Sequence, residues 1–97
     1  MRLPQHYDSG PLVAAITALD WSQDAAAGAA KIIQTTVQER FGESLPTAEA
    51  VWLLGSLLNR RLIRMQTHPD DAHKHVPDRT LRRAKYVRVP PADHTSH

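Results

Sequence analysis

Residues 45–66 read LPTAEAVWLLGSLLNRRLIRMQ, and this stretch decides the fold of the chain. Its first half begins like a capped helix at Thr47 and is dense in large apolar residues, at the spacing of a helix that packs on a core. It then passes through two arginines into the segment LIRM, in which apolar and charged residues alternate as in a strand. We therefore expect a core helix that leads into a β-hairpin.

The apolar residues of this helix predict its buried face. Val51, Leu54 and Leu58 recur at helical spacing, and the face is completed by Ala48, Trp52, Leu53, Leu57 and Leu62. Such a helix is central in a small domain, or it presents part of its surface to another chain. We expect Trp52 in the core beside Trp21; the alternative is an exposed anchor for a protein partner.

Two helices are expected before this stretch. The first occupies residues 9–20, with Ser9 or Gly10 as its cap and a proline near the first turn. The second occupies residues 23–41 and ends before Gly42, where a left-handed residue typically closes a helix. These helices are expected to cover the apolar faces of the central unit.

The chain divides into one domain and two ends. Its 97 residues suffice for a single domain with a modest core, here residues 9–89. This domain includes a long polar loop at residues 67–83, followed by a second strand at residues 84–89. Residues 1–8 are expected to be a flexible arm and residues 90–97 a disordered tail. The expected fold class is mostly α with a small β-hairpin.

The composition excludes several kinds of site. The sequence contains no cysteine, so neither a disulfide framework nor a thiolate metal site can form. No apolar run is long enough to span a membrane, and none near the N-terminus resembles a secretion signal. We therefore expect a cytoplasmic protein without a membrane contact.

Charge is distributed unevenly along the chain. Residues 1–58 carry three basic and six acidic side chains, a net charge of −3, whereas residues 59–89 carry nine basic and three acidic ones, a net charge of +6. A one-sided basic segment of this kind favours an acidic partner, with nucleic acid first among them.

The order helix, helix, turn, helix, strand, loop, strand resembles the winged-helix branch of the helix-turn-helix proteins. The segments LLNRRLIRMQ and RRAKYVRVP, at residues 57–66 and 82–90, are similar to the end of a recognition helix and the two strands of a wing. The resemblance covers about residues 11–89 and lies in this pattern rather than in a specific motif. It implies that the third helix enters the DNA major groove and that basic wing residues contact phosphates or the minor groove.

The resemblance also assigns roles by position. The groove-facing candidates are Thr47, Glu49, Ser56 and Asn59, and the wing candidates are Lys74, Arg79, Arg82, Arg83, Lys85 and Arg88. The chain departs from the pattern in a longer second helix and in a third helix whose start lacks the basic and amide side chains that normally read base edges. We therefore expect phosphate binding with weak sequence preference, or specificity supplied by dimerisation.

The basic residues around the hairpin are the strongest functional signal. They predict a surface that neutralises phosphates, formed by Arg60, Arg61, Arg64, Arg79, Arg82, Arg83, Lys85 and Arg88. The alternative is a solvated hairpin whose arginines pair with the acidic residues of its own loop, Asp70, Asp71 and Asp78.

The loop also contains five side chains of the kinds that ligate zinc or nickel: His68, Asp70, Asp71, His73 and His75. Because no structure around them is predicted, we expect a polar loop and no metal or other cofactor. The sequence contains neither a glycine-rich phosphate loop nor a grouped nucleophile and base, so we expect no enzymatic activity.

Two functions are consistent with these observations. The leading one is a small DNA-binding protein, such as a transcription regulator, that uses the basic hairpin and the adjoining helix end. The alternative is a protein-interaction module, an adaptor or inhibitor, that docks through Trp52 and Leu53 on the apolar third helix. A homodimer is compatible with both, because an over-apolar helix can bury its surplus face against a copy of itself.

Overall fold

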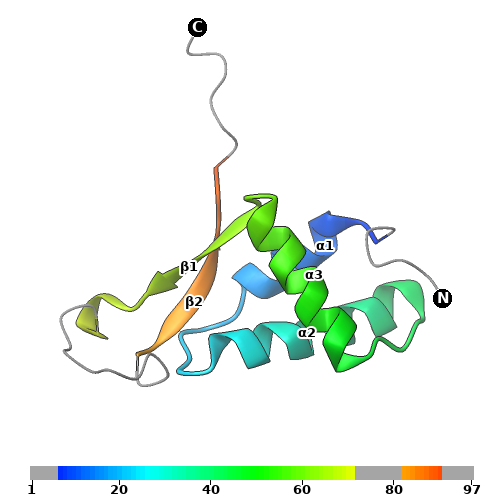
Figure 1. Cartoon of the computed structure of the whole chain (residues 1–97), viewed down its shortest axis with the longest axis horizontal. Helices are drawn as coiled ribbons and strands as arrows, with labels where there is room; N and C mark the ends of the chain where they lie inside the picture. Colours follow the sequence, from blue (N-terminus) through cyan, green and yellow to red (C-terminus); the bar gives the residue numbers. More distant parts are fainter. Residues whose placement is uncertain (1–6, 72–81, 91–97) are drawn as a thin grey trace, which may run out of the picture.

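The structure is a computed structural model that describes residues 7–71 and 82–90. Its elements are the helices α1 (Ser9–Thr17), α2 (Ala25–Phe41) and α3 (Thr47–Asn59), the strands β1 (Ile63–Thr67) and β2 (Ala84–Arg88), and between the strands the 3-10 turn η2 (Pro69–Asp71). Figure 1 shows the three helices packed together, with the hairpin of β1 and β2 on one side of them. The expected fold class, mostly α with a small β-hairpin, is confirmed.

Side chains cap α1 and α2, whereas α3 begins at Thr47 after Pro46 without a side-chain cap, so the expected cap at Thr47 is wrong. The Asp8 carboxylate caps α1 by accepting a hydrogen bond from the Gly10 backbone N–H at 3.1 Å, so the expected cap at Ser9 or Gly10 is wrong by one or two residues. Asp24 caps α2 in the same manner. The predicted left-handed cap at Gly42 is confirmed, with φ at 67°.

The buried face of α3 is turned from the predicted one, which was centred on Val51, Leu54 and Leu58 and only widened by Leu53 and Leu57. It is formed by Ala50, Leu53, Leu54 and Leu57, each no more than 5% exposed, whereas Val51, on the predicted face, is 53% exposed. When a helix is apolar on almost every side, the spacing of its apolar residues does not identify which face is buried. The face that is buried is set by where α1, α2 and the hairpin pack.

One core joins all these elements. Leu12 and Ile16 of α1, Ile33 and Val37 of α2, and Tyr86 of β2 pack with the buried face of α3 and are almost fully buried. A single core of this size is typical of a domain of about 100 residues. Within the described residues, no helix combines the length and apolar character that crossing a membrane requires.

The core extends to Tyr7, which was expected in the flexible arm. The Tyr7 ring centroid lies 5.0 Å from that of Phe41, and its hydroxyl donates a hydrogen bond to Glu43 Oε1 at 2.6 Å. The arm prediction is therefore wrong for Tyr7 and for the cap residue Asp8, because an aromatic ring and a capping carboxylate tie this segment to two helices. Residues 1–6 and 91–97, the rest of the predicted arm and most of the predicted tail, lie outside the described residues.

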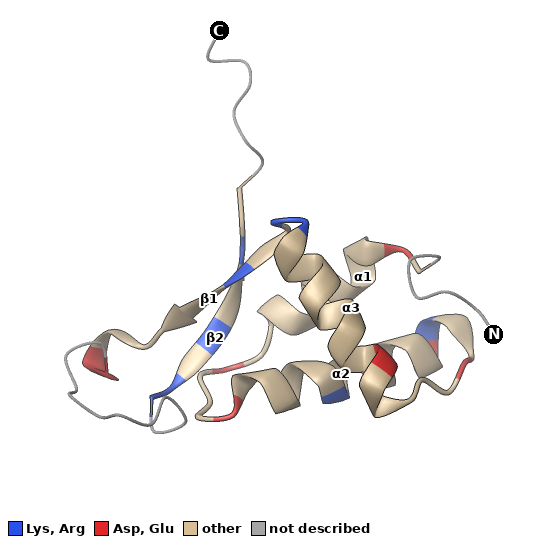
Figure 2. Cartoon of the chain, in the orientation of Figure 1, with Lys and Arg blue, Asp and Glu red and all other residues tan. Residues whose placement is uncertain are grey.

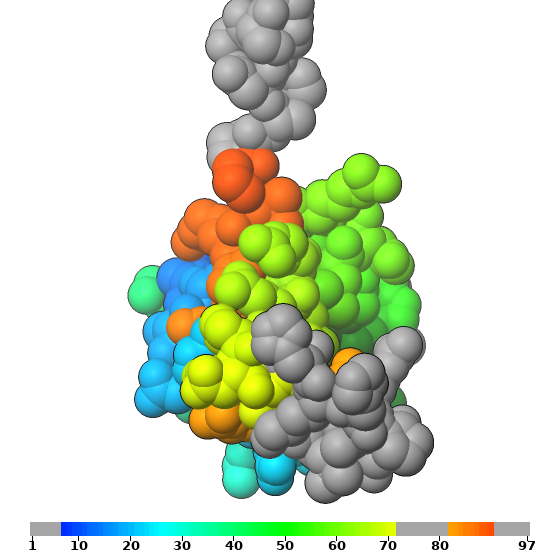
Figure 3. Space-filling view, turned by 90° about the vertical axis from the view of Figure 1, so that its left-hand side faces the viewer, coloured from blue at the N-terminus to red at the C-terminus, as the bar shows by residue number. Residues whose placement is uncertain are grey.

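The hairpin strands are antiparallel, with Ile63 opposite Arg88 and Thr67 opposite Ala84. Opposed residues share a face of the ribbon, and this face turns Ile63, Ala84 and Tyr86 into the protein, where all three are buried. Figure 3 views the molecule from the hairpin side, with α3 in green to the right and α1 in blue to the left. The hairpin therefore lies against the helices rather than standing free of them.

The connection between α1 and α2 adds one further residue to this sheet. Ser22 and Ala84 exchange two backbone hydrogen bonds, from Ser22 N–H to the Ala84 carbonyl at 2.9 Å and from Ala84 N–H to the Ser22 carbonyl at 2.8 Å. The sequence carries no alternating pattern for this bridge because a single residue forms it. The bridge holds the hairpin to the helical part of the chain.

Candidate nucleic-acid interface

Four arginines gather where α3 ends and the hairpin begins. Arg60 and Arg61 follow the last turn of α3, Arg64 is the second residue of β1, and Arg88, the last residue of β2, lies opposite Ile63. Figure 2 shows basic positions, in blue, at the upper end of the hairpin beside the end of α3. These four residues, Arg60, Arg61, Arg64 and Arg88, are named the arginine end below.

Backbone hydrogen bonds fix the turn that carries Arg60 and Arg61. The Arg60 N–H donates to the Ser56 carbonyl at 2.9 Å, and the Arg61 N–H donates to the Leu58 carbonyl at 3.0 Å. Arg61 has φ at 59°, a left-handed conformation in which a side chain is strained. This residue ends the helix abruptly, so that β1 begins two residues later and brings Arg64 close to the same turn.

All four side chains of the arginine end are exposed. Arg64 lies opposite Val87 and Arg88 opposite Ile63, so the two arginines are on opposite faces of the ribbon. Within the part of the chain that the structure describes, none of the four forms a salt bridge. Their charges are therefore presented to solvent around one end of the hairpin.

Arg83, near the other end of the hairpin, is held by a buried aspartate. Asp71 has no exposed surface, and its carboxylate accepts hydrogen bonds from the Arg83 backbone N–H at 2.8 Å, from Nε at 2.9 Å and from Nη2 at 3.1 Å. The side-chain hydrogen bonds to Asp71 raise the pKa of Arg83 above its ordinary value. For Arg83, the alternative in which the loop acids neutralise the hairpin arginines is correct.

Lys85 packs on an aromatic ring. Its Nζ lies 5.4 Å from the centroid of the Trp21 ring, within the range of a cation–π contact. The imidazole of His68 meets the same indole edge-on, with the ring centroids 4.7 Å apart. Trp21 thus lies beside His68 and Lys85 at the outer surface of the hairpin, and sequence reasoning missed this contact.

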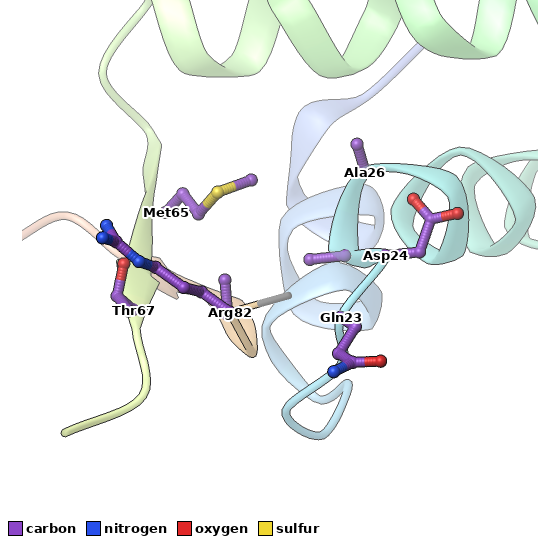
Figure 4. Close-up of a pocket in the computed structure, with 8 residues that line it drawn as sticks. Gln23, Asp24, Ala26, Met65, Thr67 and Arg82 are labelled. Atoms are coloured by element: carbon purple, nitrogen blue, oxygen red, sulfur yellow. The ribbon is translucent and has the colours of Figure 1, made fainter. Parts of the chain in front are cut away.

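Arg82 borders a hollow between the hairpin and the start of α2. The hollow has a volume of about 490 Å³, and its lining includes Gln23 and Ala26 from the α2 side and Met65 and Thr67 from β1. In Figure 4 the Arg82 side chain extends past Thr67, away from α2. The remaining predicted basic residues of the wing, Lys74 and Arg79, and the acidic Asp78 lie outside the described residues.

Of the five loop side chains whose types can ligate a metal, three lie in the part of the chain that the structure describes. His73 and His75 lie outside it, and within it no group of three His, Asp or Glu side chains could hold a metal ion. His68 Nδ1 accepts a hydrogen bond from the Asp70 N–H at 3.0 Å, and Asp71 binds Arg83. These three residues shape the turn after β1.

The outward face of α3 is apolar at its centre. Trp52 is 52% exposed, so its predicted place in the core beside Trp21 is wrong, and Leu53 is 4% exposed, so it belongs to the core and not to the predicted protein interface. The two residues follow each other on a helix and point about 100° apart, and α3 packs so that Leu53 but not Trp52 faces the core. Which one does so cannot be read from their hydropathy.

The groove-facing candidates offer few groups for reading bases. Asn59 is exposed, but Glu49 and Ser56 are half-buried, and the Thr47 hydroxyl accepts a hydrogen bond from Gln34 Nε2 at 3.3 Å. Of the eight predicted phosphate-binding residues, the structure brings four together at the arginine end and places three elsewhere on the hairpin. Comparisons of the chain with protein-family models, with curated proteins and with solved structures found no match.

Proposed function

We propose that the chain is a winged-helix-like domain that binds duplex DNA by neutralising phosphates at the arginine end. The observation that carries this proposal is the group of four exposed arginines around the turn between α3 and β1 and the adjoining end of β2, none of them in a salt bridge with a described residue. Guanidinium groups bind phosphate through two parallel hydrogen bonds and stay charged at any physiological pH. The role is one of binding rather than catalysis, in the cytoplasm.

The distribution of charge supports the same proposal. Residues 59–89 carry a net charge of +6, and the paired Arg83 lies at the other end of the hairpin from the arginine end, where its guanidinium binds the buried carboxylate of Asp71. The bridge between Ser22 and Ala84 holds the hairpin to the helices. At the arginine end, the Val89 N–H donates a hydrogen bond to the Leu62 carbonyl at 3.0 Å, which joins the start of the hairpin to its last strand beside Arg61 and Arg88.

The proposed binding has little dependence on DNA sequence. Contacts to phosphates position a protein on the duplex, whereas sequence is read by hydrogen bonds to base edges. The exposed face of α3 contains Val51 and Trp52 where such hydrogen-bonding side chains would be needed. We therefore assign α3 the role of setting the positions of Arg60 and Arg61.

The exposure of Trp52 favours a second function for α3, the docking of a protein surface. Tryptophan is enriched among residues that dominate binding energy at protein interfaces. This function is separable from phosphate binding, because Trp52 and the arginines of β1 and β2 lie on different elements.

A pair of matched double variants tests the DNA-binding proposal. Arg64→Gln/Arg88→Gln should weaken binding to a labelled duplex of random sequence and reduce the slope of log K against log salt by about 1.8, because each phosphate neutralised contributes about 0.9. Fluorescence anisotropy at several salt concentrations gives both quantities.

The control is Lys31→Gln/Arg40→Gln, which removes the same charge from exposed positions on α2. It should leave the slope of the salt dependence almost unchanged. If both double variants lose affinity equally, net charge rather than the arginine end drives binding, and the proposed site is wrong.

A further inference from the structure

The outward side of α3 carries a stripe of residues that are not in the core. Ala48, Trp52, Gly55 and Asn59 recur at intervals of four, three and four residues and so lie in one row along the helix. Trp52 is 52% exposed in the middle of this row, and Val51 beside it is 53% exposed. Two large apolar side chains on adjacent exposed positions mark an interaction surface. The four residues of the row are named the outer stripe below.

A hollow lies on this same surface, one helical turn after Trp52. It has a volume of about 280 Å³ and is lined by Trp52, Gly55, Ser56, Asn59 and Arg60. A Cβ atom on Gly55 would meet no other atom within 4 Å, so a side chain at residue 55 would extend into open space at the hollow. The outer stripe thus contains both a projecting ring and an adjacent recess.

We propose that the occupant of this surface is a second copy of the chain, with two α3 helices packed antiparallel so that Trp52 of each copy enters the hollow at Gly55 of the other. In a twofold dimer every contact is made twice with the roles exchanged, so an interface must be complementary to itself. The outer stripe meets this condition, since ring and recess alternate along one helix. Ala48 and Gly55 allow the two helix backbones to approach closely.

The charges at the two ends of α3 favour an antiparallel over a parallel packing of the two helices. Glu49 lies in the first turn of α3, and Arg60 follows its last turn. An antiparallel arrangement brings Glu49 of one copy toward Arg60 of the other at both ends of the interface. A parallel arrangement would instead bring the two glutamates together and the two arginines together, which is unfavourable.

The lining of the hollow matches the chemistry of an indole ring. The indole N–H needs an acceptor when it is buried, and the side-chain oxygens of Ser56 and Asn59 are acceptors in the lining. The guanidinium of Arg60 can lie over the ring in a cation–π contact. DNA is a poorer occupant, because Val51 and Trp52 offer a phosphate nothing and Glu49 repels it. An occupant of this surface needs an aromatic ring for the hollow and an acidic side chain near Arg60. A second α3 supplies both, in Trp52 and Glu49.

The test is the mass of the protein in solution without DNA, so its outcome is independent of the proposed DNA binding. A single helix pair buries a small interface, and such interfaces are weak, so the wild-type chain should shift from its 10.8 kDa monomer to twice that mass between about 1 µM and about 1 mM. Sedimentation equilibrium measures this shift. A monomer throughout that range would overturn the proposal.

Two variants locate the interface. Trp52→Ala should weaken dimerisation about 30-fold, as for an interface hot spot, and Gly55→Arg should abolish it by filling the hollow. The Gly55 variant keeps its fold, because the new side chain starts in open space and replaces the glycine by a better helix former. Thermal unfolding by circular dichroism checks this at a concentration where the protein is monomeric.

Met65→Ala is the matched control, because Met65 is 47% exposed and apolar but lies on β1, outside the outer stripe. Its dimerisation constant should stay within about twofold of the wild type. A dimer that persists in Gly55→Arg, or that is lost equally in Met65→Ala, would show that another surface associates.

A charge exchange tests the antiparallel direction. Glu49→Arg and Arg60→Glu should each weaken the dimer between about twofold and tenfold, and the double variant Glu49→Arg/Arg60→Glu should recover the wild-type constant. Failure of the double variant to recover would contradict the antiparallel pairing, whatever the result of the DNA titration.

Discussion

The carboxylate of Asp71 is fully buried, and its hydrogen bonds join the chain after β1 to the chain before β2. Asp71 ends η2, which follows β1, and Arg83 immediately precedes β2. The Arg83 N–H and guanidinium both donate to this carboxylate, so one side chain satisfies a backbone group and pairs with a charge. The contact closes the hairpin beyond the last pair of its ladder, Thr67 and Ala84.

Loss of this carboxylate should destabilise the domain. Asp71→Ala leaves the Arg83 N–H without its acceptor, and we expect the free energy of unfolding to fall by about 1–3 kcal/mol. Urea denaturation measures the change. The control is Asp70→Ala, since Asp70 is exposed and adjacent, and it should change stability by no more than about 0.5 kcal/mol. Equal effects of the two substitutions would contradict a structural role for the buried pair.

Single side chains were the hardest features to predict from the sequence. Trp52 and Leu53 are neighbours with large apolar side chains, and only the packing of α3 against the other helices decides that Leu53 is buried and Trp52 is not. The pairing of Arg83 with Asp71 likewise joins residues 12 positions apart. Such contacts depend on the folded arrangement, and local pattern does not contain them.

Two glycines of α2 contribute to its stability in different ways. Gly28 lies near the start of α2 in open space, with an ordinary backbone conformation, whereas Gly42 closes the same helix with φ at 67°. Alanine has a higher helix propensity than glycine but is strained in the left-handed conformation. Substitution by alanine should therefore stabilise the domain at position 28 and destabilise it at position 42.

We expect Gly28→Ala to raise the free energy of unfolding by about 0.5–1 kcal/mol and Gly42→Ala to lower it by about 1 kcal/mol. Both are measured by thermal unfolding at a monomeric concentration, and each serves as the control for the other. A loss of stability in Gly28→Ala would mean that α2 packs more closely at its start than the structure places it.

The order and limits of the elements were predicted well because they depend on local signals. Helix spacing, the Gly42 cap and the apolar alternation around Ile63 all act within a few residues. The buried face of α3 and the bridge from Ser22 to Ala84 were not predicted, since both arise from contacts between distant parts of the chain. The candidate site follows the same division. The sequence shows which arginines are present near the hairpin. It does not show that Arg83 binds Asp71 or that Lys85 packs on Trp21, away from the arginine end.

Over the whole molecule, the uneven charge of the sequence becomes a spatial separation. In Figure 2 the acidic positions of the helices lie away from the basic turn at the upper end of the hairpin. A dimer through the outer stripe would place the two arginine ends at opposite ends of the paired α3 helices, about 20 Å apart for helices of 13 residues. Arg60 would face Glu49 of the other copy, so each copy would offer Arg61, Arg64 and Arg88 to phosphates. Two such groups at that spacing would bind a duplex more tightly than one, without any base contact.

Phosphate neutralisation by the arginine end would appear in the salt dependence of wild-type binding to a duplex of random sequence. Four arginines that each neutralise one phosphate predict that log K falls against log salt with a slope of about −3.6 or steeper for each protomer bound. Anisotropy titrations of a labelled duplex at increasing salt give this slope. Absence of binding at low salt, or binding with a slope near zero, would contradict the account.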